Sequence, residues 1–398
     1  MSAQLQEGAK RADPGLVTGG RRGMVGTVRE RVARACVVLV SSLLCALSSA
    51  QTASREPLRN PFRKAADNLP IAVRVLVLNY DPFVPSEGGK RLHEVFHWND
   101  PRALAKDYQA SLEVASDGAV QFKIVEWRDL DEIYAQKDGY RHGPDEYVRL
   151  RRAGKAWHDG GGQDYPRLLS EQRVPALVDA PAGSPRRVDE VWIFSDHFFG
   201  LWEASMAGPG AFFVNGGVYP EVPVGRPFVF YGFNYERGVA EMLHNTCHRA
   251  EATLNRIFGE WKLSAPRNDW ELFSANASQS GGFAGVGTCH WPANAEKDYD
   301  YDNPRMVQSW ALDFLNYPNL KCRDRTSARR PVSQDTWVAA SGLANRDPHR
   351  SYMLWYFTLL PRAPGTGPDG RQNNWWKYVY DFTRYDQTGK PTHAGAGR

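Results

Sequence analysis

The chain has 398 residues, of which 42% are hydrophobic and 12% aromatic, and its 49 Lys and Arg against 45 Asp and Glu give a formal charge of +4. This composition excludes an intrinsically disordered chain, and the length allows a large buried core. A charge so near balance gives no electrostatic basis for binding nucleic acid or an anionic membrane surface.

The N-terminal segment predicts export. A stretch with several arginines leads into the apolar run 35–47, and small residues ending at Ala50 follow it, which is the three-part order of a secretory signal. The run is shorter than the ~20 residues that a membrane span needs, so we expect cleavage near Ala50 and no permanent span. Residues 1–50 are thus predicted to be a targeting segment, with Met24 as an alternative start, and the mature protein is predicted to be secreted or periplasmic.

Three further parts are expected along the chain: a polar lead-in over 51–68, a single globular domain over 69–385 and a loose tail over 386–398. The domain begins with the almost continuously apolar segment 71–79, which predicts a strand buried on both faces. Residues 101–114 begin with a proline and have helical spacing, so they predict a helix.

Strand and helix patterns continue to alternate through the middle of the domain. Further strands are expected at 119–127, 188–194 and 227–233, and helices at 144–153, 165–179 and 235–258. Strands separated by helices predict an α/β body, a layered mixed sheet in which a long helix follows a late strand. Beyond residue 259 the periodicity weakens: residues 310–315 are expected to belong to a helix, 352–360 are a compact apolar run and 373–382 are dense in aromatic residues.

The long helix carries a stripe of ionisable residues. At 100° per residue, Arg237, Glu241, His244, His248 and Glu251 fall in one strip beside the apolar face. Two imidazoles four residues apart can bind one divalent ion, as in HExxH metallopeptidases, and a nearby carboxylate can complete the coordination or act as a base. We therefore expect His244, His248 and Glu251 as metal ligands, Glu241 as a general base and Arg237 as a carbonyl or carboxylate clamp.

The match to known metallopeptidase helices is incomplete. A long helix after a late strand is also found in zincin-type enzymes, although this is an analogy at the level of the fold. Asn245 stands where a zincin has the glutamate that directly follows its first histidine, and no GxxH follows His248. A metal-free catalytic cluster and a purely structural network of paired side chains therefore remain open.

The cysteines and one loop histidine add to this hypothesis. His290 follows Cys289 in a loop and is a candidate fourth ligand. Outside the targeting segment there are three cysteines, and an odd number in an oxidising compartment predicts one bridge and one free thiol. Because Cys289 and Cys322 both lie in loop-like sequence, we expect them to pair and Cys247, within the helix, to be a buried thiol.

An acidic loop is the next candidate. Asp298, Asp300 and Asp302 alternate with tyrosines, but Asn303 and Ser309 replace the glycine and the closing glutamate of an EF-hand. An EF-hand is therefore rejected and only a looser calcium site is left.

Polar residues after the predicted strands are weaker candidates, because α/β proteins place ligands at such positions. These residues are Asp81, Asp196, His197 and Glu203. The chain has no GxSxG, P-loop or GxGxxG motif, so serine-hydrolase, nucleotide-hydrolysing and dinucleotide-binding functions lack their usual signatures.

Three segments carry a resemblance to a known group of proteins. They are NYERGVAEMLHNTCHRAE at 234–251, VDEVWIFSDHFFGLWEASMAGPG at 188–210 and NNWWKY at 373–378. Together they resemble a family of uncharacterised secreted bacterial proteins, over about residues 70–382. The resemblance implies export and one continuous fold, and it implies no activity, cofactor or site.

The leading hypothesis is a secreted metal-dependent hydrolase, a zinc peptidase-like enzyme acting on an extracellular peptide or polysaccharide. One alternative is a metal-independent carbohydrate-active enzyme that uses carboxylates such as Glu241 and Glu203, favoured by the 13 Trp and 17 Tyr. Another is an extracellular polysaccharide- or partner-binding protein without catalysis, in which the stripe is structural.

Overall fold

The structure is a computed structural model that describes residues 70–160, 162–260 and 266–392. The predicted targeting segment 1–50 and the lead-in 51–68 lie outside the described residues, as does the end of the predicted tail.

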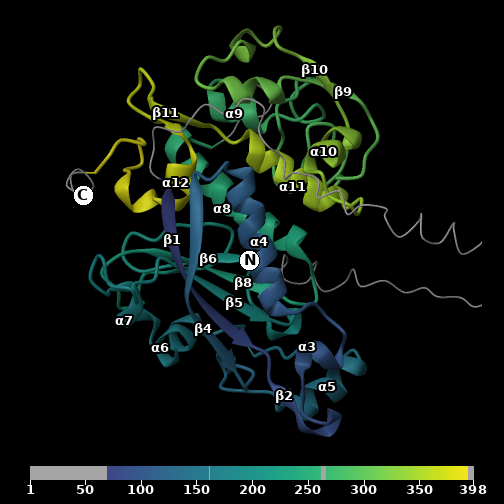
Figure 1. Cartoon of the computed structure of the whole chain (residues 1–398), viewed down its shortest axis with the longest axis vertical. Helices are drawn as coiled ribbons and strands as arrows, with labels where there is room; N and C mark the ends of the chain where they lie inside the picture. Colours follow the sequence, from purple (N-terminus) through teal and green to yellow (C-terminus); the bar gives the residue numbers. More distant parts are fainter. Residues whose placement is uncertain (1–69, 161, 261–265, 393–398) are drawn as a thin grey trace, which may run out of the picture. The chain divides into compact units, whose positions relative to one another are not determined.

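A six-stranded sheet with the order β4-β1-β5-β8-β6-β7 lies at the centre of the described residues (Figure 1). The four strands β4, β1, β5 and β8 are parallel, β6 is antiparallel to β8, and β7 is parallel to β6. The mixed α/β architecture predicted from the sequence is confirmed. The strands are β1 (Ile71–Tyr80), β4 (Val120–Leu130), β5 (Glu190–Ser195), β6 (Ala204–Ala207), β7 (Val218–Tyr219) and β8 (Phe228–Asn234).

The central strands are apolar because both faces of the sheet are covered. Every residue of β5 is buried, and so are the last six residues of β1. The chain starts at β1, adds β4 on one side of it and then returns to add β5 on the other side. The order in which strands are added to the sheet therefore reverses between β1 and β5. Such a switch point leaves a crevice at the carboxyl ends of the strands, and Asp81 and Asp196 follow these two ends.

Helices cover the sheet and build a further layer at the C-terminal end of the chain (Figure 1). Most of the predicted helices are present, with shifted ends. The helices are α3 (Leu92–Val95), α4 (Pro101–Ala115), α5 (Pro144–Arg152), α6 (Tyr165–Glu171), α7 (Val174–Val178), α8 (Val239–Phe258), α9 (Asp269–Ser274), α10 (Gln334–Ser341), α11 (Pro348–Leu359) and α12 (Trp376–Tyr380).

Two helix predictions need correction. The single helix expected over 165–179 is interrupted, because Arg173 adopts the left-handed conformation with φ 51° and separates α6 from α7. The long helix begins at Val239 rather than at residue 235, because Gly238 is extended and its amide donates to Glu241 Oε2 at 3.1 Å, which closes the first turn. Arg237 therefore lies in the turn before α8.

Short two-stranded ribbons and 3₁₀ turns complete the described residues. The run 310–315, expected to belong to a helix, lies mostly in the 3₁₀ turn Ala311–Asn316. Residues 386–392 turn back on the chain, with the amide of Thr392 donating to the carbonyl of Arg384. The ribbons are β2 (Phe83–Val84) with β3 (Lys90–Arg91), β9 (Val307–Ser309) with β10 (Arg330–Val332), and β11 (Arg362–Thr366) with β12 (Gln372–Asn374).

Helix α8 is anchored to the sheet through two polar side chains. The buried Asn245 amide donates to the carbonyl oxygens of Glu203 and Gly232, each at 3.1 Å. One turn later Arg249 forms an ion pair of 2.5 Å with Glu190 on β5, and both side chains are at least 97% buried. These contacts determine which face of α8 is turned toward the sheet. Within the described part of the chain, no helix combines the length and apolarity needed to cross a bilayer.

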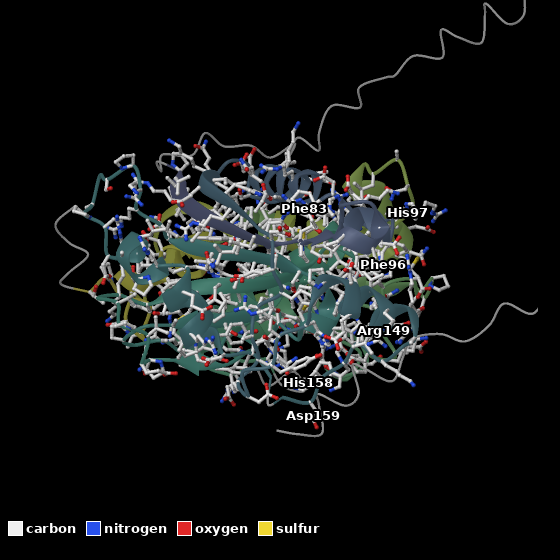
Figure 2. The ribbon with its side chains drawn as sticks, turned by 90° about the horizontal axis from the view of Figure 1, so that it is seen from below. Phe83, Phe96, His97, Arg149, His158 and Asp159 are labelled. Carbon is white, nitrogen blue, oxygen red and sulfur yellow. The ribbon has the colours of Figure 1, made fainter. Side chains whose placement is uncertain are left out.

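The buried ion pair predicts a large effect of removing one partner. Arg249→Met leaves the Glu190 carboxylate buried without its counter-charge, so we expect the free energy of unfolding, measured by urea titration, to fall by about 3–5 kcal/mol. The double variant Arg249→Met/Glu190→Gln should recover part of this loss. Arg149→Met is the matched control, because Arg149 lies exposed on α5 (Figure 2) and should change stability by less than about 0.5 kcal/mol. Equal losses for both single variants would contradict the prediction.

Candidate metal centre

Four imidazoles converge between α8, the loop that follows α9, and α11. His244 and His248 come from consecutive turns of α8, His290 from the loop, and His349 from the first turn of α11. The ring of His244 lies 4.7 Å from that of His248, 5.0 Å from that of His290 and 5.3 Å from that of His349, measured between centroids. A helix spacing of four residues places the first pair on one face, and tertiary packing supplies the other two rings.

His248 and His290 face each other through one nitrogen and face carboxylates through the other. Their Nε2 atoms are 3.2 Å apart. The Nδ1 atom of His290 lies 3.2 Å from Asp298 Oδ1, and that of His248 lies 3.7 Å from Glu251 Oε2. Metal-binding histidines commonly direct the second ring nitrogen to a carboxylate, which orients the ring and raises its basicity. The two rings are therefore arranged as a pair of metal ligands would be.

The Nδ1 atom of His244 is crowded by polar groups. Cys289 Sγ, Tyr301 Oη and His349 Nε2 each lie 3.3 Å from it. One ring nitrogen forms only one hydrogen bond, as a donor or as an acceptor. His244 Nδ1 therefore cannot form hydrogen bonds with all three neighbours at once. The lone pairs of the atoms gathered here suit a cation.

The donor atoms of His244, His248, Cys289 and His290 all lie within 4.8 Å of one another, so this cluster can bind a metal ion. In a tetrahedral zinc site with usual bond lengths, neighbouring donors are about 3.3–3.6 Å apart. The separation of 3.2 Å between His248 and His290, and that of 3.3 Å between His244 and Cys289, are close to this range. The other separations extend to at most 4.8 Å and would have to shorten for all four donors to bind one ion.

Buried hydrogen bonds hold the loop of Cys289 and His290 against α8. The amide of Cys289 donates to Glu251 Oε1 at 2.6 Å, and the carbonyl of Cys289 accepts from Tyr301 Oη at 2.8 Å. Tyr299, with a left-handed φ of 58°, lays its ring 4.3 Å from that of His290. Glu251 thus connects both parts of the cluster, since its other oxygen faces His248.

Burial keeps most of these imidazoles neutral. It lowers the pKa of His244 well below its usual value, with further contributions from the neighbouring histidines, and it lowers the pKa of His290 and brings that of His349 to about 4. For His248, burial also acts to lower the pKa, but the hydrogen bond with Glu251 and the charge of Glu203 outweigh it and the pKa is raised. Neutral imidazole is the form that binds metals.

A small polar hollow of about 30 Å³ adjoins the cluster. Glu203, Arg237 and Glu241 contribute to its wall. Glu203 Oε2 lies 3.5 Å from His248 Nε2 and accepts a hydrogen bond from Asn215, which has an unusual φ of 105°. Burial raises the pKa of the Glu241 carboxyl, which is the direction expected of a carboxylate that acts as a general base.

The structure brings most of the sequence-predicted site residues together. His244, His248 and His290 form one cluster, Glu251 contacts it from the side of the His248 Nδ1 atom, and Glu241 and Arg237 line the adjoining hollow. Glu203 belongs to the same hollow.

The predicted Cys289–Cys322 disulfide is wrong. Both thiols are free and buried, as is that of Cys247. Cys289 is directed to His244 on α8, whereas the amide of Cys322 is bound by Asp313 in a separate turn. Loop-like sequence around two cysteines carries no information on whether their side chains meet.

Other candidates lie apart from the cluster or have structural contacts. Asp300 accepts from the Glu296 amide and from Asn303, so its carboxylate orders the loop. Within the described ranges the three alternating aspartates are not gathered as a metal-binding group.

At the carboxyl ends of the strands a second polar cluster is present. Asp196, His197 and Glu236 lie close enough to hold an ion, but Arg151 already contacts both carboxylates, at 3.1 and 2.8 Å. Asp81 pairs with His93 at 2.6 Å. The Arg151 guanidinium thus already supplies positive charge to both carboxylates, while the buried Asp196 Oδ1 has no hydrogen-bond partner among the described residues.

Sequence reasoning missed three residues of the centre. Cys289 was expected in a disulfide rather than as a ligand, and His349 and Tyr301 carry no local signal. His349 is the second residue of α11 and reaches the centre only because α11 packs on α8.

Comparison with known proteins gives no homology for this chain. It matches no protein-family model, no curated protein and no solved structure.

The depressed pKa of His349 predicts a pH dependence of stability in metal-free protein. The unfolded chain takes up a proton at this residue as the pH falls below about 6.5, but the folded chain does so only near pH 4. Stability therefore falls between pH 7 and pH 4.5, with about 2–3 kcal/mol from this group. His349→Gln should flatten the pH dependence of the free energy of unfolding, measured with urea, whereas His158→Gln should not. An unchanged slope in the His349 variant would reject this assignment.

Proposed function

We propose that this chain is a secreted metal-dependent hydrolase that holds one zinc ion between α8 and the loop carrying Cys289 and His290. The observation that carries the proposal is the arrangement of His248 and His290, whose Nε2 atoms meet at 3.2 Å while both Nδ1 atoms face carboxylates. The export part of the proposal rests on the N-terminal sequence.

The donor set supports zinc. Imidazole nitrogens combined with one thiolate suit a borderline-soft ion that prefers four ligands in a tetrahedron. When bound, such an ion supplies Lewis acidity and activates water. The chain's own residues supply the rest: Glu241 or Glu203 accepts a proton, and Arg237 binds a carbonyl or carboxylate of the substrate. The substrate proposed is an extracellular peptide or polysaccharide.

The role proposed for Glu251 differs from that expected from its spacing. Its two oxygens face the Cys289 amide and His248 Nδ1, so we assign it to orienting these ligands rather than to binding the ion. Asp298 has the same role for His290. The proposal also includes two features of the fold. The long helix is arranged as in zincins, and residues 69–385 form one continuous body.

Metal analysis tests the proposal directly. Purified mature protein should contain about one equivalent of zinc per chain by elemental mass spectrometry, and the double variant His244→Ala/His248→Ala should lose it because two donors are removed. His158→Ala is a matched control, since His158 pairs with Asp138 and is not part of the cluster. Circular dichroism should confirm that each variant is folded.

Zinc retained by the folded double variant would contradict the ligand assignment. If metal is confirmed, peptidase and amidase substrates should be turned over by the zinc-loaded protein and not by the protein treated with chelator. Turnover that survives complete metal removal would reject the metal-dependent mechanism.

The orienting carboxylates predict a smaller effect on affinity. Asp298→Asn and Glu251→Gln should each weaken zinc binding by about 10–100-fold without abolishing it, because they remove ring orientation and not a donor atom. Competition with a chromophoric chelator measures the dissociation constants. Asp302→Asn is the control in the same loop and should leave affinity unchanged. Complete loss of zinc in the Glu251 variant would instead make this residue a ligand.

A metal-independent carbohydrate-active enzyme is the second candidate, because Glu203 and Glu241 line the same hollow. Paired carboxylates about 5–10 Å apart could cleave a glycosidic bond without an ion. Glycoside turnover in chelator, lost in Glu241→Gln, would favour this function over the first.

A further inference from the structure

Two cysteines meet inside the proposed metal centre. Cys247 lies on α8 between His244 and His248, and its side chain is completely buried. Cys289 Sγ lies 3.5 Å from the carbonyl oxygen of His244. Residues three apart on a helix share a face, so this carbonyl group lies on the same side of α8 as the Cys247 side chain. Burial raises the pKa of both thiols, and each thiol also affects the pKa of the other. The loop cysteine is thus in contact with the helix cysteine and with a histidine at the same time.

The third cysteine of the described residues lies elsewhere. Cys322 is in a 3₁₀ turn, and its amide donates to Asp313 at 2.9 Å. Among the cysteines that the structure describes, this leaves Cys247 as the neighbour with which Cys289 can react, and Cys322 provides a buried cysteine outside the centre for comparison.

We propose that Cys247 and Cys289 form a disulfide in the metal-free protein and that this bond and the bound zinc ion exclude each other. The inference rests on the proposed function, because it takes Cys289 as a zinc ligand and adds a redox control of that same site.

The chemistry requires one oxidant, a small-molecule disulfide such as oxidised glutathione. One protein thiolate attacks the disulfide and releases one glutathione thiol, and the second thiolate displaces the other, so two protein thiols lose two protons and two electrons. A Cys289 thiolate that is donating to zinc is unavailable for this attack. Conversely, a disulfide sulfur is no longer an anionic donor, so oxidation leaves three imidazoles and a weaker site.

The experiment compares zinc-loaded and zinc-free full-length mature protein after incubation with oxidised glutathione. Intact mass and peptide mapping should show a Cys247–Cys289 bond, with the loss of two hydrogens, in the zinc-free sample and not in the zinc-loaded one. Zinc affinity of the oxidised sample should be at least about tenfold weaker and should return after reduction.

Matched variants separate the two cysteines. Cys247→Ser, with Cys247→Ala as a second form, should retain zinc affinity within about threefold and become insensitive to oxidation. Cys322→Ser should behave as the wild type does.

Three results would overturn the inference: a bridge that forms equally in zinc-loaded protein, no bridge within the zinc-free protein, or unchanged zinc affinity once the bridge is formed. If the reduced wild-type protein binds no zinc, the proposed function itself fails, and this result is distinct from the three above.

Discussion

The site depends on how α8 is seated on the sheet, and Asn245 is the central contact. Its amide group donates to carbonyl oxygens of two different strand regions, those of Glu203 and Gly232. Because neighbouring residues on a helix are 100° apart, directing Asn245 to the sheet places His244 about 100° and His248 about 60° around the helix from it, where they face His349 and His290. The residue that departs from the zincin pattern is therefore the one that sets the rotation of the helix. A glutamate there would bring a charge against two carbonyl oxygens.

The electrostatics of the centre favour a bound cation. Glu251 is buried, and Glu203 and Asp298 stand within 3.5 Å of the histidine pair. Burial keeps the pKa of His244, His290 and His349 low, so His248, whose pKa is raised by Glu251 and Glu203, is the ring of these four that can supply compensating positive charge. Glu251 is the buried carboxylate of this group, since the side chains of Glu203 and Asp298 are 40% and 52% exposed, and a divalent ion would add to the compensation that His248 provides.

Local sequence patterns predicted the helices and strands whose residues have a clear hydrophobic period. The apolar segment 71–79 and the amphipathic segment 235–258 have clear periods, and they became β1 and the long helix α8. The pairing of His290 with His248, the contact of His349 with His244, and the environment of Cys289 come from contacts between distant segments, which periodicity does not describe. The disulfide prediction failed for the same reason: it relied on the compartment and on loop character, and neither determines which thiols meet.

The position of the hollow bears on whether the proposed zinc ion would be catalytic or structural. Structural sites are closed by four protein donors, whereas catalytic sites keep one position open toward the substrate, so the four donors His244, His248, Cys289 and His290 would support catalysis only with a further coordination position on the side of the hollow. Here Cys289 and His244 form the buried side of the cluster, while His248 borders the hollow through Glu203. The exposed Arg237 belongs to the same hollow and has no ion pair with any of the described residues. A purely structural ion would need neither an accessible guanidinium nor a carboxylate on this side. The asymmetry of the surroundings, more than the number of donors, is what argues for chemistry at this site.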